Sequence, residues 1–79
     1  MGEMKRHLNE LRVGESAVID SFTDPDLQVK LLEMGCTPGE TIQVEKFSPL
    51  GDPVAYNISG YILSMRLAEA ATVTIRSQR

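Results

Sequence analysis

Two side chains of this protein have types that could act in covalent catalysis: Cys36, the sole cysteine, and His7, the sole histidine. A cysteine nucleophile needs a base held within hydrogen-bond reach. The two residues lie far apart in the sequence, and His7 is close to an N-terminus that we expect to be flexible. A free cysteine is most often a small buried hydrophobe. We therefore predict no catalytic residues and a protein that is not an enzyme.

Metal and cofactor sites lack a recognisable motif. Asp24, Asp26 and Asp52 carry carboxylates that could bind a divalent metal. However, Asp24 is better explained as a helix cap, and Asp52 lies in a proline-rich turn where aspartate is usually structural. His-x-x-His, Cys-x-x-Cys and Glu-x-x-His spacings do not occur. The segment 49–52 lacks the lysine and the following helix of a phosphate-binding loop. We predict neither a metal site nor a bound cofactor.

The charge balance disfavours a nucleic-acid binder. Eight Lys and Arg face eleven Asp and Glu, giving a net charge of −3, whereas nucleic-acid binders usually carry a basic stripe. Residues 1–11 are charged and do not resemble a secretory signal. No segment approaches the ~20 apolar residues that span a bilayer. We expect a cytoplasmic protein that makes no contact with nucleic acid and reaches a membrane only through a partner.

One helix is expected at about 25–34. Asp24 is suited to the N-cap, and Pro25 then occupies the first helical position, where its missing N–H does no harm. Apolar residues recur at helical spacing and form one stripe: Leu27, Leu31 and Met34. Gly35 fits the left-handed position that ends many helices. The sequence Thr37-Pro38-Gly39-Glu40 then predicts a type II turn.

The remaining elements are expected to be strands. Alternating or β-branched runs, separated by Gly and Pro, predict five of them: 16–22, 42–45, 54–59, 61–66 and 72–75. A short helical turn is expected at about 67–71, where helix-forming residues are too few for more than one turn. Gly60 favours a bend. The prediction is a mostly β, five-stranded SH3-like barrel with one inserted helix, forming a single domain over 1–79 with its core at about 8–76 and flexible ends.

The order of several segments resembles the FeoA family of bacterial ferrous iron uptake. The segments that carry the resemblance are 31–39 (LLEMGCTPG), 42–44 (IQV), 48–53 (SPLGDP), 60–61 (GY) and 65–70 (MRLAEA). The resemblance implies an SH3-like barrel, no enzymatic activity, and support of the membrane transporter FeoB, whose cytoplasmic part carries a GTPase domain. Leu67 and Ala68 depart from the charged or polar residues that the family often has there.

Protein docking is the remaining function, and three regions are candidates for it. They are the loop with Leu50, Gly51 and Asp52, the helix face with Gln28, Lys30 and Glu33, and Leu67. Each has a simpler alternative. Leu50 could fold back onto the barrel, since single exposed apolar residues are common. The helix face could be merely solvated. Leu67 could be a core contact.

The resemblance and the docking regions together predict the function. The chain is expected to be an accessory or regulatory subunit that docks on the cytoplasmic side of a FeoB-like GTPase transporter and modulates it. The alternative is a ferrous-iron-sensing module that binds the metal itself. A small barrel also leaves strand edges exposed, which allows weak homo-oligomers.

Overall fold

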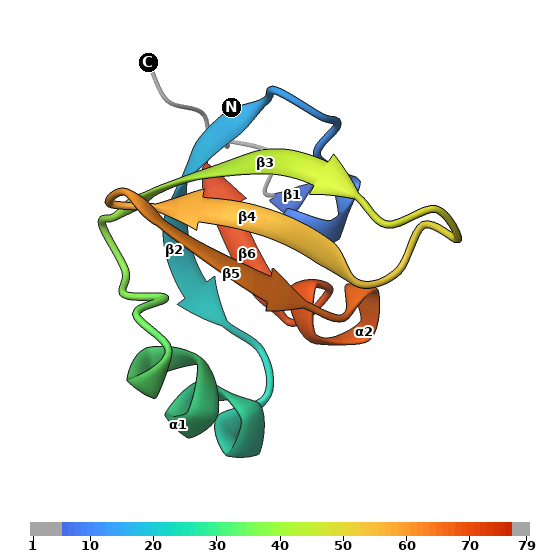
Figure 1. Ribbon diagram of the computed structural model, residues 1–79. Coiled ribbons are helices and arrows are strands. Elements are labelled where there is room, and N and C mark those ends of the chain that lie inside the picture. Colours follow the sequence, from blue (N-terminus) through green and yellow to red (C-terminus); the bar gives the residue numbers. More distant parts are fainter. Residues whose placement is uncertain (1–5, 77–79) are drawn as a thin grey trace.

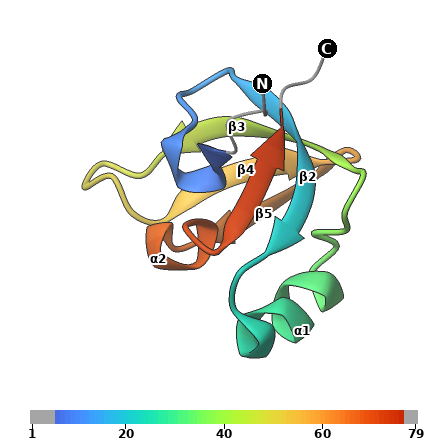
Figure 2. The ribbon, with the colours of Figure 1, turned by 180° about the vertical axis from the view of Figure 1, so that it is seen from behind.

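The computed structural model describes residues 6–76, which form one curled antiparallel sheet with two helices and a 3-10 turn (Figure 1). The strands are β1 (Arg6–His7), β2 (Ser16–Phe22), β3 (Thr41–Phe47), β4 (Val54–Ile58), β5 (Tyr61–Met65) and β6 (Val73–Arg76). The helical elements are η1 (Leu8–Glu10), α1 (Pro25–Glu33) and α2 (Leu67–Ala70). The order of strands across the sheet is β1-β6-β2-β3-β4-β5. Seen from behind, β1 and η1 lie beside β6 and α2 (Figure 2).

The expected mostly β fold with one inserted helix is confirmed, but the strand count of five was wrong. The sixth strand is β1, in which Arg6 pairs with Ile75 and His7 with Thr74. Two residues are too few to show an alternating pattern in the sequence. They form a strand because β6 has a free edge with which they can pair. His7 therefore belongs to the sheet. Residues 1–5 and 77–79, on which the expectation of flexible ends falls, lie outside the described residues.

Local signals account for the bounds of α1. The Asp24 carboxylate accepts hydrogen bonds from the backbone N–H groups of Asp26 (2.9 Å) and Leu27 (3.2 Å), as an N-cap should. The helix ends one residue earlier than expected, with Met34 as its C-cap, and Gly35 follows at φ +100°. No helix in the described part of the chain is long and apolar enough to cross a bilayer.

The core lies inside the curl of the sheet, and α1 joins it through one residue. Fully or almost fully buried side chains come from every strand except the two-residue β1, and they alternate along β3 and β4 as the period-two pattern predicts. From α1, Leu31 is completely buried, while Leu27 and Met34 pack against the core at its margin. The predicted apolar stripe is thus the face that holds α1 against the sheet.

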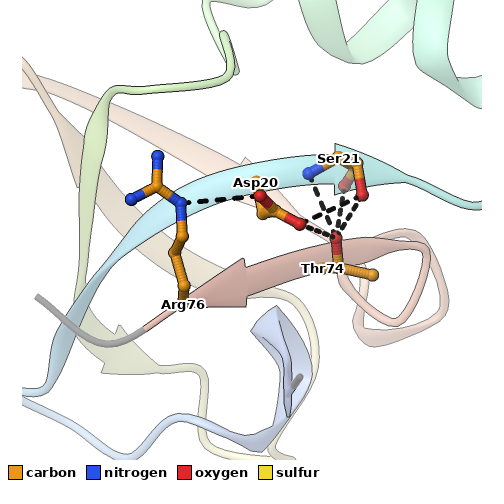
Figure 3. A network of polar contacts seen from close by, with 4 residues as sticks. All are labelled: Asp20, Ser21, Thr74 and Arg76. Atoms are coloured by element: carbon orange, nitrogen blue, oxygen red, sulfur yellow. Dashed lines mark hydrogen bonds and ion pairs between the residues drawn. The ribbon is translucent and has the colours of Figure 1, made fainter. Parts of the chain in front are cut away.

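A buried hydroxyl holds the pairing of β2 with β6 (Figure 3). The register shifts between Ile19 and Ser21, so Asp20 is the extra residue of a bulge. Thr74 Oγ1 accepts a hydrogen bond from Ser21 N (3.0 Å) and donates to Ser21 O (3.1 Å), and the two hydroxyl oxygens lie 2.6 Å apart. The Asp20 carboxylate also pairs with Arg76 Nε at 3.5 Å. Thr74 is only 7% exposed, so water cannot replace these bonds.

We predict that Thr74→Val destabilises the protein. Valine keeps the shape of threonine but lacks the hydroxyl to which the Ser21 backbone is bonded. Leaving a buried polar group without its hydrogen bond lowers the free energy of unfolding by about 1–3 kcal/mol. Urea unfolding measures the change. The control is Thr41→Val on β3, an exposed position for which we expect a change within about 0.5 kcal/mol. Equal stability of the Thr74 variant and the unmodified protein would contradict this account of the bulge.

Candidate functional site

Short helix α2, which begins with the candidate residue Leu67, is contacted by side chains from the other two candidate docking regions. Asp52 Oδ1, from the loop between β3 and β4, accepts a hydrogen bond from Leu67 N at 2.9 Å. Lys30 Nζ, from α1, donates to Glu69 Oε2 at 2.8 Å. The loop projects from the same end of the sheet as α2 in both views (Figures 1 and 2). We call the surface formed by Lys30, loop 48–53, Leu67 and Glu69 the α2 face.

The loop of the α2 face holds the Leu50 side chain away from the rest of the fold. Ser48 Oγ donates to Pro53 O (2.7 Å), and Ser48 N donates to the same oxygen (3.2 Å), so the two ends of the loop are joined. Gly51 N donates to Ser48 O (2.7 Å), which closes a turn with Gly51 at φ +90°, a backbone conformation that favours glycine. Leu50 is 95% exposed at the tip. It therefore does not fold back onto the barrel.

The candidate helix face is only partly open. Lys30 is engaged with Glu69, which links α1 to α2 across the surface. Glu69 Oε1 also accepts from Arg66 N at 2.9 Å. The hydrogen bond from Lys30, and then the one from the Arg66 backbone, hold the pKa of the Glu69 carboxyl below its usual range. Gln28 is half-buried and Glu33 is exposed, and among residues 6–76 no side-chain hydrogen bond or ion pair joins either to α2.

The Leu67 side chain mainly packs against the core and offers little exposed apolar surface. Its side chain is half-buried and packs against the core, while its backbone N–H is used by Asp52. The apolar content of the α2 face therefore comes mainly from Leu50.

The residues considered for catalysis are kept apart. Cys36 is completely buried, and desolvation raises the pKa of its thiol to about 11. His7 Nδ1 lies 3.3 Å from Glu10 Oε2 on the surface. Within residues 6–76, no interaction joins Cys36 to His7, and no three His, Cys, Asp or Glu side chains gather as a metal ion would require. Asp24 serves as the helix cap, as expected.

A second exposed apolar region, around the start of β5, escaped the sequence analysis. Tyr61 is 75% exposed and Ile62 is 60% exposed. Beside them, a cavity of about 150 Å³ lies between the end of α1 and the β4–β5 hairpin, with Met34, Ile58 and Leu63 among its lining residues. The available signal was the composition of β5, Tyr-Ile-Leu-Ser-Met, which contains no charge on either face.

We predict that Lys30→Met raises the pKa of Glu69 toward its ordinary value. The substitution removes the hydrogen bond and the positive charge that stabilise the carboxylate, so protonation begins at higher pH. The stabilisation from this pair is present above the unfolded-state pKa and is lost as the pH falls through the folded one. Carboxyl-carbon NMR titration of Glu69 measures the shift. Lys46→Met is the control, and we expect it to leave the pKa of Glu69 unchanged. If Lys30→Met also left the pKa of Glu69 unchanged, the result would contradict the pairing of Lys30 with Glu69.

We also predict that Cys36 is inert in the folded protein. A buried thiol with a pKa of about 11 is almost entirely protonated at pH 8, and the thiolate is the reactive form. Alkylation by iodoacetamide at pH 8 should therefore be slow in buffer and fast in denaturing urea. Rapid alkylation without urea, followed by mass spectrometry, would show that the thiol is accessible and would contradict the observed burial.

Comparison with known proteins places these features in a family. The family model described as FeoA domain matches residues 6–77. A fusion of Fe(2+) transport protein A with Fe(2+) transporter FeoB from Porphyromonas gingivalis is 39% identical over 69 residues, covering 86% of this chain. The chain spans only 8% of that relative's length.

Solved structures agree with the family model. The FeoA protein from Chlorobium tepidum has a TM-score of 0.85 at 33% identity, covering 94% of this chain and 71% of its own. Stenotrophomonas maltophilia FeoA, solved with zinc and described as a prokaryotic SH3 domain protein, has a TM-score of 0.77 at 27% identity, covering 89% and 88%. The expected SH3-like fold is thereby confirmed, with six strands and an open seam between edge strands β1 and β5. This chain belongs to the FeoA domain family.

Proposed function

We propose that this protein is an accessory, regulatory subunit of a bacterial ferrous iron uptake system, and that it docks through its α2 face on the cytoplasmic side of a FeoB-like GTPase transporter. The observation that carries the proposal is Leu50, a large apolar side chain held at the tip of a hydrogen-bonded loop with 95% of its surface exposed. The P. gingivalis relative supports the choice of partner, since its name joins an A-type protein and a FeoB transporter in one chain.

The geometry of the loop suits an anchor residue. Interface energy is concentrated in a few side chains that fill pockets on the partner. A loop already closed by Ser48 and Pro53 loses little conformational freedom on binding, so more of the burial energy of Leu50 appears as affinity. The Asp52 carboxylate at the end of this loop and the Lys30–Glu69 pair on the other side of Leu67 add polar groups to the α2 face.

Modulation follows if docking distinguishes two states of the transporter. A partner that binds both states equally shifts nothing, whereas one that prefers the nucleotide-bound state increases the population of that state. In this account the nucleotide binds to the transporter. The small domain changes the transporter only through the difference between its affinities for the two transporter states.

The test is binding of the purified protein to its cognate transporter in nanodiscs, with and without a GTP analogue. We expect saturable binding whose affinity changes with nucleotide. Leu50→Asp should weaken it by about tenfold to a hundredfold, because burying a leucine contributes about 1.5–3 kcal/mol and a tenfold change in affinity is about 1.4 kcal/mol. The matched control is Val13→Asp, which alters another exposed apolar side chain in a turn outside the α2 face.

Each result has a clear meaning. Loss of binding in Leu50→Asp, but not in Val13→Asp, supports docking through the α2 face. Unchanged binding of Leu50→Asp, or equal losses in both variants, would contradict docking through the α2 face. Absence of binding in every nucleotide state would overturn the proposal and favour the alternative that the protein senses iron. An anaerobic titration of the protein with Fe²⁺ tests that alternative.

A further inference from the structure

The loop of the α2 face is tied to the rest of the fold through Asp52. Its other hydrogen bonds stay within the loop: Ser48 N and Oγ both donate to Pro53 O, and Gly51 N donates to Ser48 O. The Asp52 carboxylate is different, because its Oδ1 accepts from Leu67 N at 2.9 Å. Outside the β3–β4 ladder, this is the one hydrogen bond in the described part of the chain that joins the loop to another element.

The element that Asp52 reaches is fixed in the core. In α2, Ala70 is completely buried, and the Leu67 side chain packs against the core cluster. The start of α2 is therefore a firm point of attachment. Asp52 follows Leu50 closely in the sequence, with Gly51 between them. A loop that is held only at its ends keeps freedom at its tip, whereas a bond beside the tip removes much of that freedom.

The Asp52 carboxylate is turned toward the fold. Asp52 is half-buried, whereas Leu50 is almost fully exposed. Burial raises the pKa of the core residue Tyr56 to about 12, and the charge of the nearby Asp52 carboxylate adds to this shift. One oxygen of the same carboxylate is already used by Leu67 N. A side chain placed in this way can hold Leu50 in position without itself contacting a partner.

We propose that Asp52 is the positioning residue of the docking site: by bonding to the start of α2, it holds loop 48–53 in the conformation that presents Leu50. The inference rests on the proposed docking through the α2 face. A loop that is ordered before binding does not have to be ordered by the partner, and fixing the backbone of one residue costs about as much free energy as a tenfold change in affinity. Removal of the Asp52 carboxylate should therefore weaken binding although Leu50 is unchanged.

Amide hydrogen exchange of the free protein tests whether Asp52 orders the loop. In Asp52→Ala we expect the Leu67 and Gly51 amides to exchange at least about tenfold faster, because the first loses its acceptor and the second loses the ordered turn. Neither amide belongs to residue 52 or directly follows it, so the substitution leaves their chemical exchange rates unaffected. Asp52→Asn keeps an acceptor oxygen and should stay within about threefold of the unmodified protein. Unchanged exchange of Gly51 in Asp52→Ala would overturn the proposal.

A double-mutant cycle on transporter binding tests whether Asp52 acts through Leu50. We expect Asp52→Ala to weaken binding to the transporter in nanodiscs by about tenfold, but by less than about twofold when Leu50 is already alanine, because the loop then has no anchor to present. Asp52→Asn should retain most of the affinity. Equal losses from Asp52→Ala in both backgrounds would mean that Asp52 contacts the transporter directly, and would overturn the positioning role.

Thr74→Val separates positioning of the loop from a general loss of stability. This variant should lower the free energy of unfolding while it leaves the bonds of the loop intact, so we expect it to bind the transporter as the unmodified protein does. A loss of affinity in Thr74→Val as large as that in Asp52→Ala would overturn the proposal. Circular dichroism confirms that each variant is folded. If Asp52→Ala does not fold, Asp52→Ser replaces it, since its hydroxyl is too short to reach Leu67 N.

Failure of this proposal can be distinguished from failure of the proposed function. If the unmodified protein does not bind the transporter, the docking is wrong, whereas the exchange rates of Leu67 and Gly51 still decide whether Asp52 orders the loop. If binding is lost in Leu50→Asp but fully retained in Asp52→Ala, docking through the α2 face stands and the positioning role of Asp52 is overturned. Faster exchange together with weaker binding in Asp52→Ala, both restored in Asp52→Asn, is the result that the proposal predicts.

Discussion

The hydrogen bond from Leu67 N to Asp52 Oδ1 is the contact on which the α2 face depends. A four-residue helix cannot sustain itself, because nucleation fixes several residues for very few hydrogen bonds. Here two carboxylates take up the free N–H groups at its start, Asp52 at Leu67 and Glu69 at Arg66. Asp52 thereby joins loop 48–53 to α2. Glu69 in turn joins α2 to α1 through Lys30.

Short-range features were predictable from the sequence, because the interactions that cause them are local. Asp24 and Pro25 start α1, and Gly35 at φ +100° follows its end. Gly39, at φ +96°, completes the turn predicted at 37–40, with Glu40 N donating to Thr37 O at 3.0 Å. In each case the residue type alone restricts the backbone to one of few conformations.

Features that depend on distant partners were not predictable. Lys30 and Glu69 are 39 residues apart, and nothing in the helical pattern of α1 indicates that this lysine is engaged. Strand β1 was missed for the same reason, since its two residues are ordered by β6. The open edge of β5 follows from the strand order, which periodicity does not reveal. The candidate loop was found because proline and glycine mark it, but the outward position of Leu50 required the structure.

The proposed function requires that the α2 face is the surface that meets the transporter. Amide hydrogen exchange of this protein, free and bound to the transporter in nanodiscs, tests it most directly, because it reports which backbone segments become protected. We predict added protection at residues 48–53 and 66–70, with its extent depending on the nucleotide, and little change along β3. Protection confined to β5 and the end of α1, with loop 48–53 exchanging as in the free protein, would contradict the claim.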